Sequence, residues 1–349
     1  MIRSLVLATG LAALSLPGHA ASFLTLDGDA PLVIAHRGAS AYLPEHTLGA
    51  YELAIRMGAD IVEPDVQLTA DGALVAMHDT SLARTTNVET LFAARNGGYD
   101  VSEFTLAEIK TLTVEPTGPA ATSYPGFTPG TAAPFAVPTL REVLDFVNTH
   151  NAATGDKIGV YPESKTPNRS ELSRKIVDEM DAAGFTGADQ NSYIQTFSHD
   201  GALEIALYQA GLGMDVPVAA LGAAVGEPGA FGVFDFTTST ISSLETLAGF
   251  AGGVGVTLSS PSLNADFIAA AHALGLEVHG WTFRPTSIEA ARTQFGTYFA
   301  LGMDAVFTDY PDLGVRVRNE LTAPVPLPAS LPLVLAGLGG LAILRRSRR

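Results

Sequence analysis

Three short motifs in the first quarter of the chain carry side chains that could act together on a phosphodiester. His36-Arg37-Gly38 follows an apolar run, and Glu63-Pro64-Asp65 precedes a turn that leads to His78-Asp79. Two imidazoles can serve as general acid and general base, carboxylates bind hard divalent cations, and a guanidinium pairs with phosphate oxygens. These residue types together predict metal-assisted cleavage of a phosphodiester.

The spacing of the acidic residues points to a metal. Glu63 and Asp65 are two positions apart, so in a strand both side chains emerge on one face. Two carboxylates on a buried face repel each other unless a cation lies between them, and two solvated acids at a rim are the alternative. Glu163 and Lys165 repeat this spacing at the end of another apolar run. Glu163 would complete a minimal ligand set and Lys165 could bind a phosphate or leaving oxygen, with an exposed ion pair as the alternative.

Other candidates have an ordinary structural interpretation beside a functional one. His36 taken alone could be a buried hydrogen-bonding residue at a strand end. Trp281 and Phe283 alternate along one predicted strand. They could form an apolar wall for a glycerol or alcohol group, or simply pack inside the fold.

The elements that would position these residues follow a repeated strand and helix pattern. Such a pattern is typical of an α/β protein, and eight parallel strands are the number of a TIM-type (β/α)8 barrel. In this fold, active sites gather at the carboxyl ends of the strands, where His36 would lie. We predict strands at 32–36, 60–65, 158–163, 193–197, 216–221, 253–258, 277–282 and 304–308, and helices at 47–57, 139–149, 171–183, 201–210 and 264–274. Thr47 and Thr139 are predicted N-caps, and Gly58, Gly184, Gly211 and Gly275 are predicted helix ends.

A hairpin and an insertion interrupt the barrel pattern after the second strand. The segment Ala70-Asp71-Gly72-Ala73 predicts a two-residue turn, because Asp-Gly favours that geometry. If Ala70 pairs with Ala73, Asp65 lies opposite His78. An insertion at about 81–138, with a short helix at 106–112, is expected to form a lid or side subdomain that influences substrate choice.

Both ends of the chain carry patterns of export. Residues 1–20 have the layout of a secretory signal, with a first core helix as the alternative. Residues 321–349 comprise a Pro-rich linker, an apolar segment at 331–344 and an Arg-rich end. This tail resembles the C-terminal sorting signal of Gram-negative bacteria, of the Val-Pro-Leu-Pro-Ala type, and a permanent membrane anchor is the alternative. The phosphodiesterase barrel would then occupy 21–320.

Composition restricts the partners. Without its ends the chain keeps 15 basic and 36 acidic residues, a net charge near −21, which argues against nucleic acid or anionic lipid as a partner. The chain has no cysteine. A hydrophobic core must therefore stabilise the exported fold, and no low-complexity linker divides the barrel region into two domains.

At this point the chain resembles the glycerophosphodiester phosphodiesterase family, in particular its periplasmic type. The stretches that carry the resemblance occur in order: His36-Arg37-Gly38-Ala39-Ser40, Tyr42-Leu43-Pro44-Glu45-His46-Thr47, Gly58-Ala59-Asp60 leading to Glu63-Pro64-Asp65, Leu74 through His78-Asp79, Tyr161-Pro162-Glu163-Ser164-Lys165, Trp281-Thr282-Phe283-Arg284, and Thr308-Asp309-Tyr310-Pro311.

The resemblance implies a role for each residue of the candidate site. His36 and His78 would be the acid and base in an order that sequence leaves open, and one Ca²⁺ or Mg²⁺ ion would be held by Glu63, Asp65 and Glu163. Arg37 and Lys165 would bind the phosphate and Trp281 the organic part of the substrate, while Glu45 would be either an outer residue or a further ligand. His46, where many intracellular members carry Asn, favours the periplasmic branch, and Ser164 replaces a more usual aliphatic residue.

The activity implied is hydrolysis of a small glycerophosphodiester to glycerol 3-phosphate and an alcohol. One alternative is phospholipase D-like action on lysolipid or sphingolipid head groups, and another is a noncatalytic binding protein displayed at the cell surface. We expect an exported protein of the periplasm, cell surface or medium. Export and sorting machinery would handle its two ends, and residues 331–344 would attach it to a membrane transiently or permanently.

Overall fold

The computed structural model describes residues 23–166 and 169–322. Contacts divide the chain into one unit of residues 22–319 and another of residues 1–21 with 320–349, and the fold below is that of the first unit. The predicted signal segment 1–20 and the apolar segment 331–344 lie outside the described residues. Within the described ranges, no helix is both long enough and apolar enough to span a bilayer.

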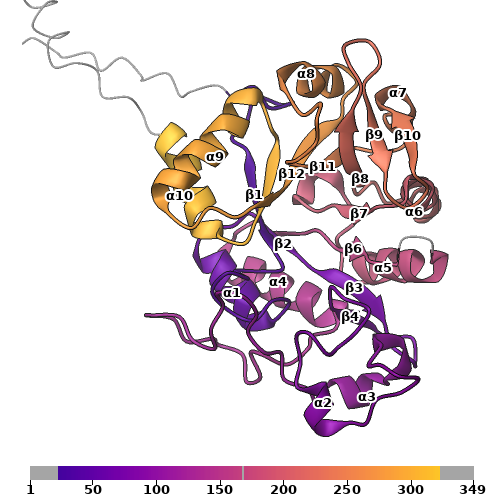
Figure 1. The fold of residues 1–349 in the computed structure, drawn as a ribbon, viewed down its shortest axis with the longest axis vertical. Coiled ribbons are helices and arrows are strands. Elements are labelled where there is room, and N and C mark those ends of the chain that lie inside the picture. The colour runs from indigo at the N-terminus through magenta and orange to yellow at the C-terminus, as the bar shows by residue number, and fades with distance from the viewer. Residues whose placement is uncertain (1–22, 167–168, 323–349) are drawn as a thin grey trace, which may run out of the picture. The chain divides into compact units, whose positions relative to one another are not determined.

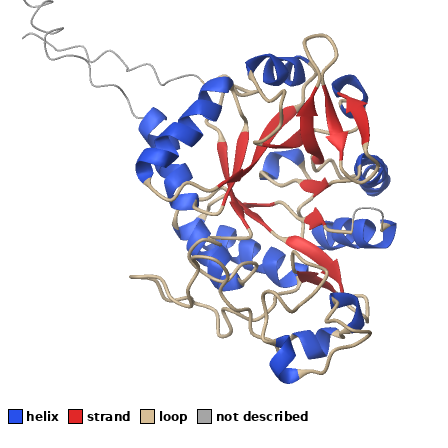
Figure 2. Cartoon of the chain, viewed as in Figure 1, coloured by secondary structure: helices blue, strands red, loops and turns tan. Residues whose placement is uncertain are grey.

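The strands and helices alternate along the chain (Figures 1 and 2). The strands are β1 (Leu32–His36), β2 (Ile61–Glu63), β3 (Asp65–Leu68), β4 (Leu74–Ala76), β5 (Gly159–Val160), β6 (Glu163–Ser164), β7 (Ile194–Thr196), β8 (Val218–Val225), β9 (Gly232–Asp235), β10 (Thr240–Ser243), β11 (Gly253–Thr257), β12 (Glu277–Phe283) and β13 (Ala305–Thr308). The α-helices are α1 (Leu48–Arg56), α2 (Val88–Leu91), α3 (Leu106–Ile109), α4 (Leu140–Thr154), α5 (Ser170–Ala182), α6 (His199–Leu212), α7 (Leu244–Leu247), α8 (Ala265–Ala273), α9 (Ile288–Leu301) and α10 (Pro311–Thr322).

Parallel pairing closes the sheet into a barrel. Strand β1 pairs with β2 on one side and with β13 on the other. Strands β2 and β3 are one barrel strand interrupted at Pro64, and β5 and β6 are another interrupted at Pro162, because proline has no N–H to donate. The ring therefore contains eight parallel strand positions, at the eight places predicted. This confirms the TIM-type (β/α)8 barrel.

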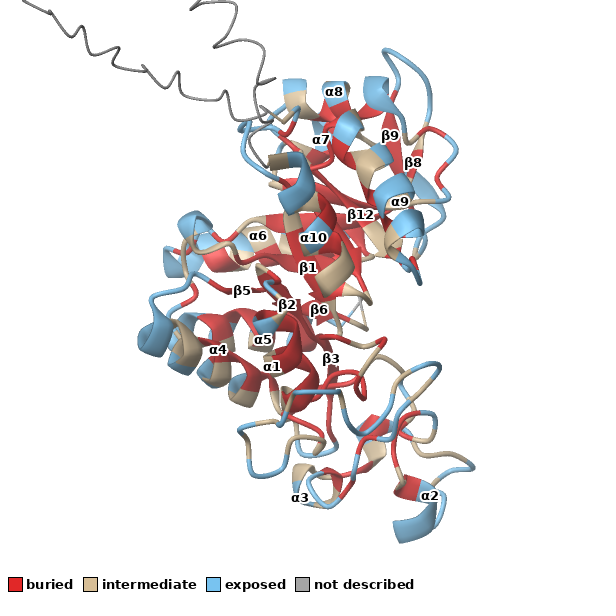
Figure 3. Ribbon diagram, turned by 90° about the vertical axis from the view of Figure 1, so that its left-hand side faces the viewer, coloured by how far each residue is buried: buried red, intermediate tan, exposed pale blue. Residues whose placement is uncertain are grey.

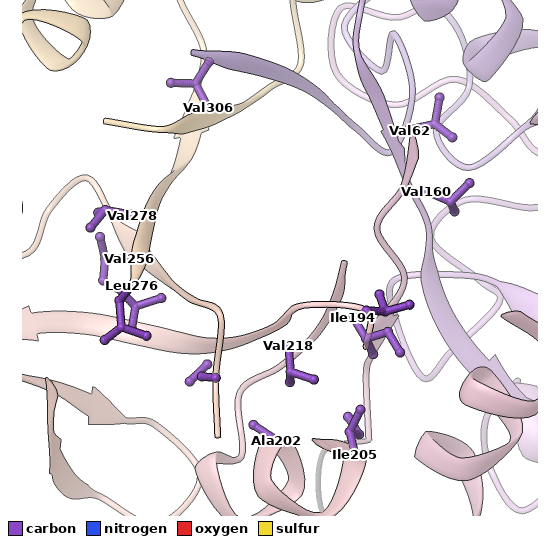
Figure 4. Packing of buried hydrophobic residues seen from close by; sticks show 14 of the residues in the cluster. Val62, Val160, Ile194, Ala202, Ile205, Val218, Val256, Leu276, Val278 and Val306 are labelled. Carbon is purple, nitrogen blue, oxygen red and sulfur yellow. The ribbon is translucent and has the colours of Figure 1, made fainter. Parts of the chain in front are cut away.

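The period-2 alternation of each strand builds two apolar layers. The outer layer lies between strands and helices. Figure 4 shows Val62, Val160 and Val218 around the outside of the ring, with Ile205 of α6 near Val218. The inner layer fills the barrel with the residues of opposite parity: Ile34, Ile61, Tyr161, Tyr193, Ala219, Ala305 and Phe307. Along each strand, every second side chain points into the barrel. Near the carboxyl ends of the strands, the inward-pointing residues are His36, Glu63, Glu163 and Gln195, so these polar side chains lie at the mouth of the barrel.

Most helix boundaries follow their predicted capping residues. Thr47 and Thr139 cap α1 and α4 with their side chains. Helix α6 differs, because it continues through Gly211 and ends at Gly213, which adopts a left-handed φ of 78°. The sequence patterns also did not identify the antiparallel β9–β10 hairpin or helices α9 and α10.

The predicted register of the β3–β4 hairpin is wrong by one residue. Val66 lies opposite Ala76, and the Met77 amide donates to the Asp65 carbonyl at 2.8 Å. Asp65 therefore faces Met77 rather than His78. The reason is the turn, which uses three residues instead of two and places Gly72 in the left-handed region at φ 78°.

The insertion at about 81–138 forms a side layer that packs on the β3–β4 hairpin. It contains α2, α3 and the 3₁₀ turn η1 (Val101–Glu103), and lies at the bottom of Figure 1. Ten buried side chains make up this second core, among them Leu82, Phe104 and Val114 of the insertion and Val75 and Met77 of the hairpin. Exposed loops surround it in Figure 3. The helix predicted at 106–112 is a single turn, α3, closed by a capping box between Thr105 and Glu108.

Candidate active site

A cavity of about 370 Å³ opens at the carboxyl ends of the barrel strands. Strand register brings distant residues together there: His36 is the partner of Glu63, and Asp65 is the partner of Glu163. The lining includes most of the predicted site: His36, Arg37, Glu63, His78, Glu163, Lys165 and Trp281. The parallel alignment of the strands, and not chain proximity, therefore assembles the site.

A tight turn after β1 fixes the direction of Arg37. Arg37 adopts a left-handed φ of 60°, and Gly38 follows at 86°. A Cβ on Gly38 would lie 2.8–3.0 Å from atoms of Ala50, so only glycine fits against α1. The Arg37 amide donates to Glu63 at 2.8 Å. The turn thus holds the guanidinium beside the acidic residues.

Glu63 and Glu163 line the cavity, and Asp65 lies directly beside them. One carboxylate oxygen from each lies within 4.8 Å of the others, and all three residues are buried. Burial raises the pKa of Glu63 well above its usual range, and the charges of Asp65 and Glu163 add to this rise. Burial likewise raises the pKa of Glu163 to about 7. Three carboxylates this close together repel one another when they are ionised. A divalent cation between them would relieve that repulsion, so the cluster has the chemistry of a cation site.

Asp65 remains ionised because three cationic or donor groups surround it. Burial acts to raise its pKa, but Lys165, Arg37 and a hydrogen bond with His46 outweigh burial and hold the pKa well below its usual value. His46 Nε2 lies 2.8 Å from Asp65 Oδ2. Lys165 Nζ lies 3.0 Å from Glu163 and 3.8 Å from Asp65. Lys165 thus bridges two members of the acidic cluster.

His36 is held by a carboxylate through its Nδ1 atom. Nδ1 lies 2.6 Å from Asp309 Oδ1, and Asp309 Oδ2 accepts from Arg284 Nε at 2.6 Å. Burial lowers the pKa of His36, and the Arg37 charge lowers it further, whereas the hydrogen bond to Asp309 opposes the change. The tether leaves Nε2 as the free ring nitrogen for proton transfer.

His78 has the same arrangement on the other side of the cavity. Its Nδ1 lies 2.6 Å from Asp79 Oδ1, and Asp79 is paired with Arg84. Burial lowers the pKa of His78 to about 4, with the Arg37 and Lys165 charges acting in the same direction and Asp65 opposing. Each candidate imidazole is therefore oriented by an aspartate that is itself paired with an arginine.

Glu45 contacts two arginines and lies outside the acidic cluster. It receives Arg37 Nη1 at 3.2 Å and a two-pronged contact from Arg84 at 2.8 and 3.1 Å. Burial acts to raise its pKa, but Arg84 and Arg37 lower it to about 2. Of the two roles left open by sequence, these contacts match an outer residue that supports the guanidinium groups.

One side of the cavity is apolar. Trp281 lies edge to face with Phe197 at 5.6 Å between ring centroids, and Leu221 and Leu258 continue this wall. Phe283 does not take part, because it is fully buried and stacks on Phe295 at 4.8 Å. Within the described part of the chain, Trp281 Nε1 is a buried donor without a hydrogen-bond partner, whereas Arg37 Nε lies 3.2 Å from Asp65 Oδ2 in an ion pair. The indole N–H is suited to an oxygen atom of a bound ligand.

Sequence reasoning assigned no role to several polar residues of the site: Asp309 and Arg284, which support His36, and also Gln195 and Arg84. Gln195 donates to Glu63 at 3.3 Å, and its position follows from the inner parity of β7. Arg84 lies in the insertion, where no strand or helix period marks its direction. The inner parity could have revealed Gln195, whereas no local signal distinguishes Arg84.

Comparisons with known proteins agree with this architecture. The profile of the glycerophosphoryl diester phosphodiesterase family matches residues 36–313. A glycerophosphodiester phosphodiesterase of Haemophilus influenzae is 30% identical over 326 residues, covering 82% of this chain and 89% of the relative. One from Bacillus subtilis is 32% identical over 302 residues, covering 84% and 88%.

A solved structure shows the same fold. The structure of an Oleispira antarctica phosphodiesterase, in complex with the product sn-glycerol-3-phosphate, superposes with a TM-score of 0.57 at 22% identity. The match covers 84% of this chain and 98% of that one. With its barrel, its ordered motifs and this similarity along most of its length, the chain belongs to the glycerophosphoryl diester phosphodiesterase family.

Proposed function

We propose that this protein hydrolyses glycerophosphodiesters to glycerol 3-phosphate and an alcohol with the help of one divalent metal ion. The observation that carries the proposal is a cluster of three buried carboxylates, two of which line a cavity together with two imidazoles that are each tethered through Nδ1. Relatives along most of the chain are named for this activity. A related phosphodiesterase was solved with glycerol 3-phosphate as its product.

The acidic cluster fits a metal ion by its chemistry. Its ligands are all oxygen atoms, as Ca²⁺ and Mg²⁺ prefer. Burial, together with the neighbouring carboxylates, raises the pKa of Glu63 and of Glu163, and a bound cation would favour their ionised forms. Glu63, Asp65 and Glu163 would hold the ion. When bound, it would supply Lewis-acid stabilisation of the negative charge on the phosphoryl oxygens.

His36 and His78 act as the general acid and general base in this proposal. One imidazole removes a proton from the attacking hydroxyl, which belongs to water or to the neighbouring glycerol hydroxyl. The other imidazole protonates the departing alcohol. The aspartate on each Nδ1 holds the ring orientation and directs Nε2 to the reaction. Since the two tethers are alike, the geometry supports the pair rather than an order of roles.

Arg37 and Lys165 bind the phosphate. The fixed turn places Arg37 in the lining of the cavity, where its guanidinium is paired with Asp65 through Nε and with Glu45 through Nη1. Lys165 lies beside Glu163 in the same lining, where its ammonium can bind a phosphate oxygen or the leaving oxygen. Trp281 and its apolar neighbours would then contact the carbon atoms of the glycerol or alcohol group.

The termini support a further proposal about location. The pattern of 1–20 and the apolar and Arg-rich tail at 321–349 favour an exported protein. The tail would act as a sorting signal. Cell fractionation of a chain carrying an internal tag, with and without residues 321–349, tests this proposal. Truncation is expected to remove the protein from the surface or the medium. If the protein stays in the cytoplasm with and without residues 321–349, the proposal is contradicted.

The activity is tested with purified protein and glycerophosphocholine, by measuring release of glycerol 3-phosphate with added Ca²⁺ or Mg²⁺ and with chelator. His36→Ala and Glu63→Ala should each lose activity by about 100-fold or more. Lysophosphatidylcholine and a sphingolipid serve as competing substrates. Head-group release from those lipids alone would favour phospholipase D-like action. A folded protein without any hydrolysis would favour a binding function.

A further inference from the structure

Arg84 connects the two halves of the candidate site from outside the cavity. Its guanidinium makes the two-pronged contact with Glu45 at 2.8 and 3.1 Å. The same group pairs with Asp79 through Nε, and Nη2 donates to Asp79 Oδ1 at 3.2 Å. Asp79 orients His78, and Glu45 contacts Arg37. One side chain of the insertion therefore contacts both the carboxylate that holds an imidazole and the carboxylate that holds the phosphate-binding guanidinium.

We propose that Arg84 is a positioning residue that fixes His78 and Arg37 relative to each other, through Asp79 and Glu45. This inference rests on the proposed hydrolysis of phosphodiesters by the same site. Arg84 itself does not line the cavity that His78 and Arg37 border, so it acts through other residues rather than on the substrate.

The chemistry of the guanidinium suits this task. A planar fork with five N–H donors can satisfy two carboxylates in fixed directions, which a lysine ammonium cannot do. The Glu45 side chain is only 9% exposed, so its negative charge needs close partners, and Arg84 supplies the larger share of its contacts. Without Arg84, the contact of Asp79 with His78 and the contact of Glu45 with Arg37 would remain, but each carboxylate would have lost its pairing with Arg84. Both carboxylates could then move with the side chains they orient.

The arginine paired with the orienting aspartate also joins a second carboxylate beside His78, whereas among the described residues the corresponding arginine beside His36 does not. Asp309 is paired with Arg284, but that guanidinium is 56% exposed and borders the cavity itself. Arg84 is 39% exposed and spans two buried or half-buried carboxylates. For His36, the arginine paired with the orienting aspartate follows a barrel strand. For His78, that arginine comes from the insertion.

Two matched variants separate positioning from simple stability of the insertion. Arg95 is another insertion arginine, paired with Glu108 and placed 4.0 Å over the Phe104 ring, away from the site. Arg95→Ala should weaken the insertion and leave kcat and KM within about twofold of the wild type. Thr117 donates to Glu45 at 3.3 Å, so it supports the Arg37 side of the site rather than Asp79 and His78. Thr117→Val should raise KM severalfold and leave kcat unchanged.

Arg84→Ala should lower kcat by about 10- to 100-fold, the range typical of residues that orient catalytic groups, and also raise KM. Steady-state kinetics on glycerophosphocholine, at saturating metal and well below the melting temperature, measure both constants. Because Arg84 is partly exposed, guanidinium ion at tens of millimolar should restore part of kcat in Arg84→Ala. Sodium chloride at the same ionic strength should not.

A double-mutant cycle with Asp79→Asn completes the test. If Arg84 acts on kcat through Asp79, the double variant should have nearly the same kcat as Asp79→Asn alone. Independent, multiplicative losses overturn the proposal. A kcat of Arg84→Ala within twofold of the wild type, or an equal loss in Arg95→Ala, also overturns it. A wild-type protein without hydrolytic activity would instead refute the proposed function, so the two failures are distinguishable.

Discussion

The Nδ1 atom of His36 lies 2.6 Å from Oδ1 of Asp309, although the two residues are 273 positions apart in the chain. Closure of the barrel between β1 and β13 creates this neighbourhood, because Ala35 is the register partner of Thr308. The imidazole at the end of the first strand is therefore oriented by a residue that follows the last strand. A complete ring is needed before this part of the site exists.

Replacing Asp309 by Asn should lower kcat by about 10- to 100-fold with little change in KM, because the ring loses the anion that fixes its tautomer. Steady-state kinetics on glycerophosphocholine measure this loss. Asp312→Asn is the matched control, because Asp312 accepts from Tyr42 at 2.8 Å and does not border the main cavity. Equal activities of the two variants would show that the tether to His36 is not used.

Chelation should abolish activity and lower the melting temperature, because Lys165 and Arg37 would then be the cations that offset the repulsion among Glu63, Asp65 and Glu163. Metal at about 100 times its dissociation constant should stabilise the fold by about 2.7 kcal/mol. Scanning calorimetry with chelator and with stepwise Ca²⁺ or Mg²⁺ gives both effects. Glu163→Gln should be the more stable protein without metal and should lose the response to metal. A melting temperature independent of metal in the wild type would contradict the site.

The acid limb of kcat/KM should lie below pH 6.5, the usual pKa of histidine. Burial lowers the pKa values of both His36 and His78, the latter to about 4, so either imidazole is neutral and able to act as a base above its lowered pKa. Glu163, with its pKa raised to about 7, must lose its proton to bind metal. The profile is therefore measured at several metal concentrations. A limb above pH 7 that does not move with metal would contradict the lowered histidine pKa values.

Glu179 provides a test of stability away from the site. Burial raises its pKa to about 7, against the opposing charge of Arg141, and its Oε2 has no hydrogen-bond partner in the described ranges. The folded state therefore holds this proton at pH values where the unfolded state has lost it, and stability falls as the pH rises from about 4.5 to 7. Since the side chain is partly solvated, Glu179→Gln should recover only about 1 kcal/mol at pH 8. The effect should be much smaller at pH 4, where both states keep the proton, and thermal melts at both pH values decide the matter.

Strand positions could be predicted from sequence because short apolar runs and their spacing reflect burial on both faces of a parallel barrel. The same spacing placed Glu63 and Glu163 at strand ends, but it left solvated acids and an exposed ion pair open as alternatives, and the strand register is what brings the three carboxylates together. The β3–β4 register could not, because a single extra turn residue, Gly72 at φ 78°, changes which side chains face each other. The contacts of Arg84 depend on how an irregular insertion packs, and no periodic pattern encodes such packing.

The separate core of the insertion has a consequence for how the enzyme would fail on heating. Leu82, Phe104 and Val114 pack on Val75 and Met77 of the β3–β4 hairpin, in a cluster separate from the barrel layers. If the insertion opened from the hairpin before the ring did, Arg84 and Thr117 would leave Glu45 while the ring kept its hydrogen bonds. Turnover would then be lost at a lower temperature than secondary structure, and would return on cooling without refolding of the barrel.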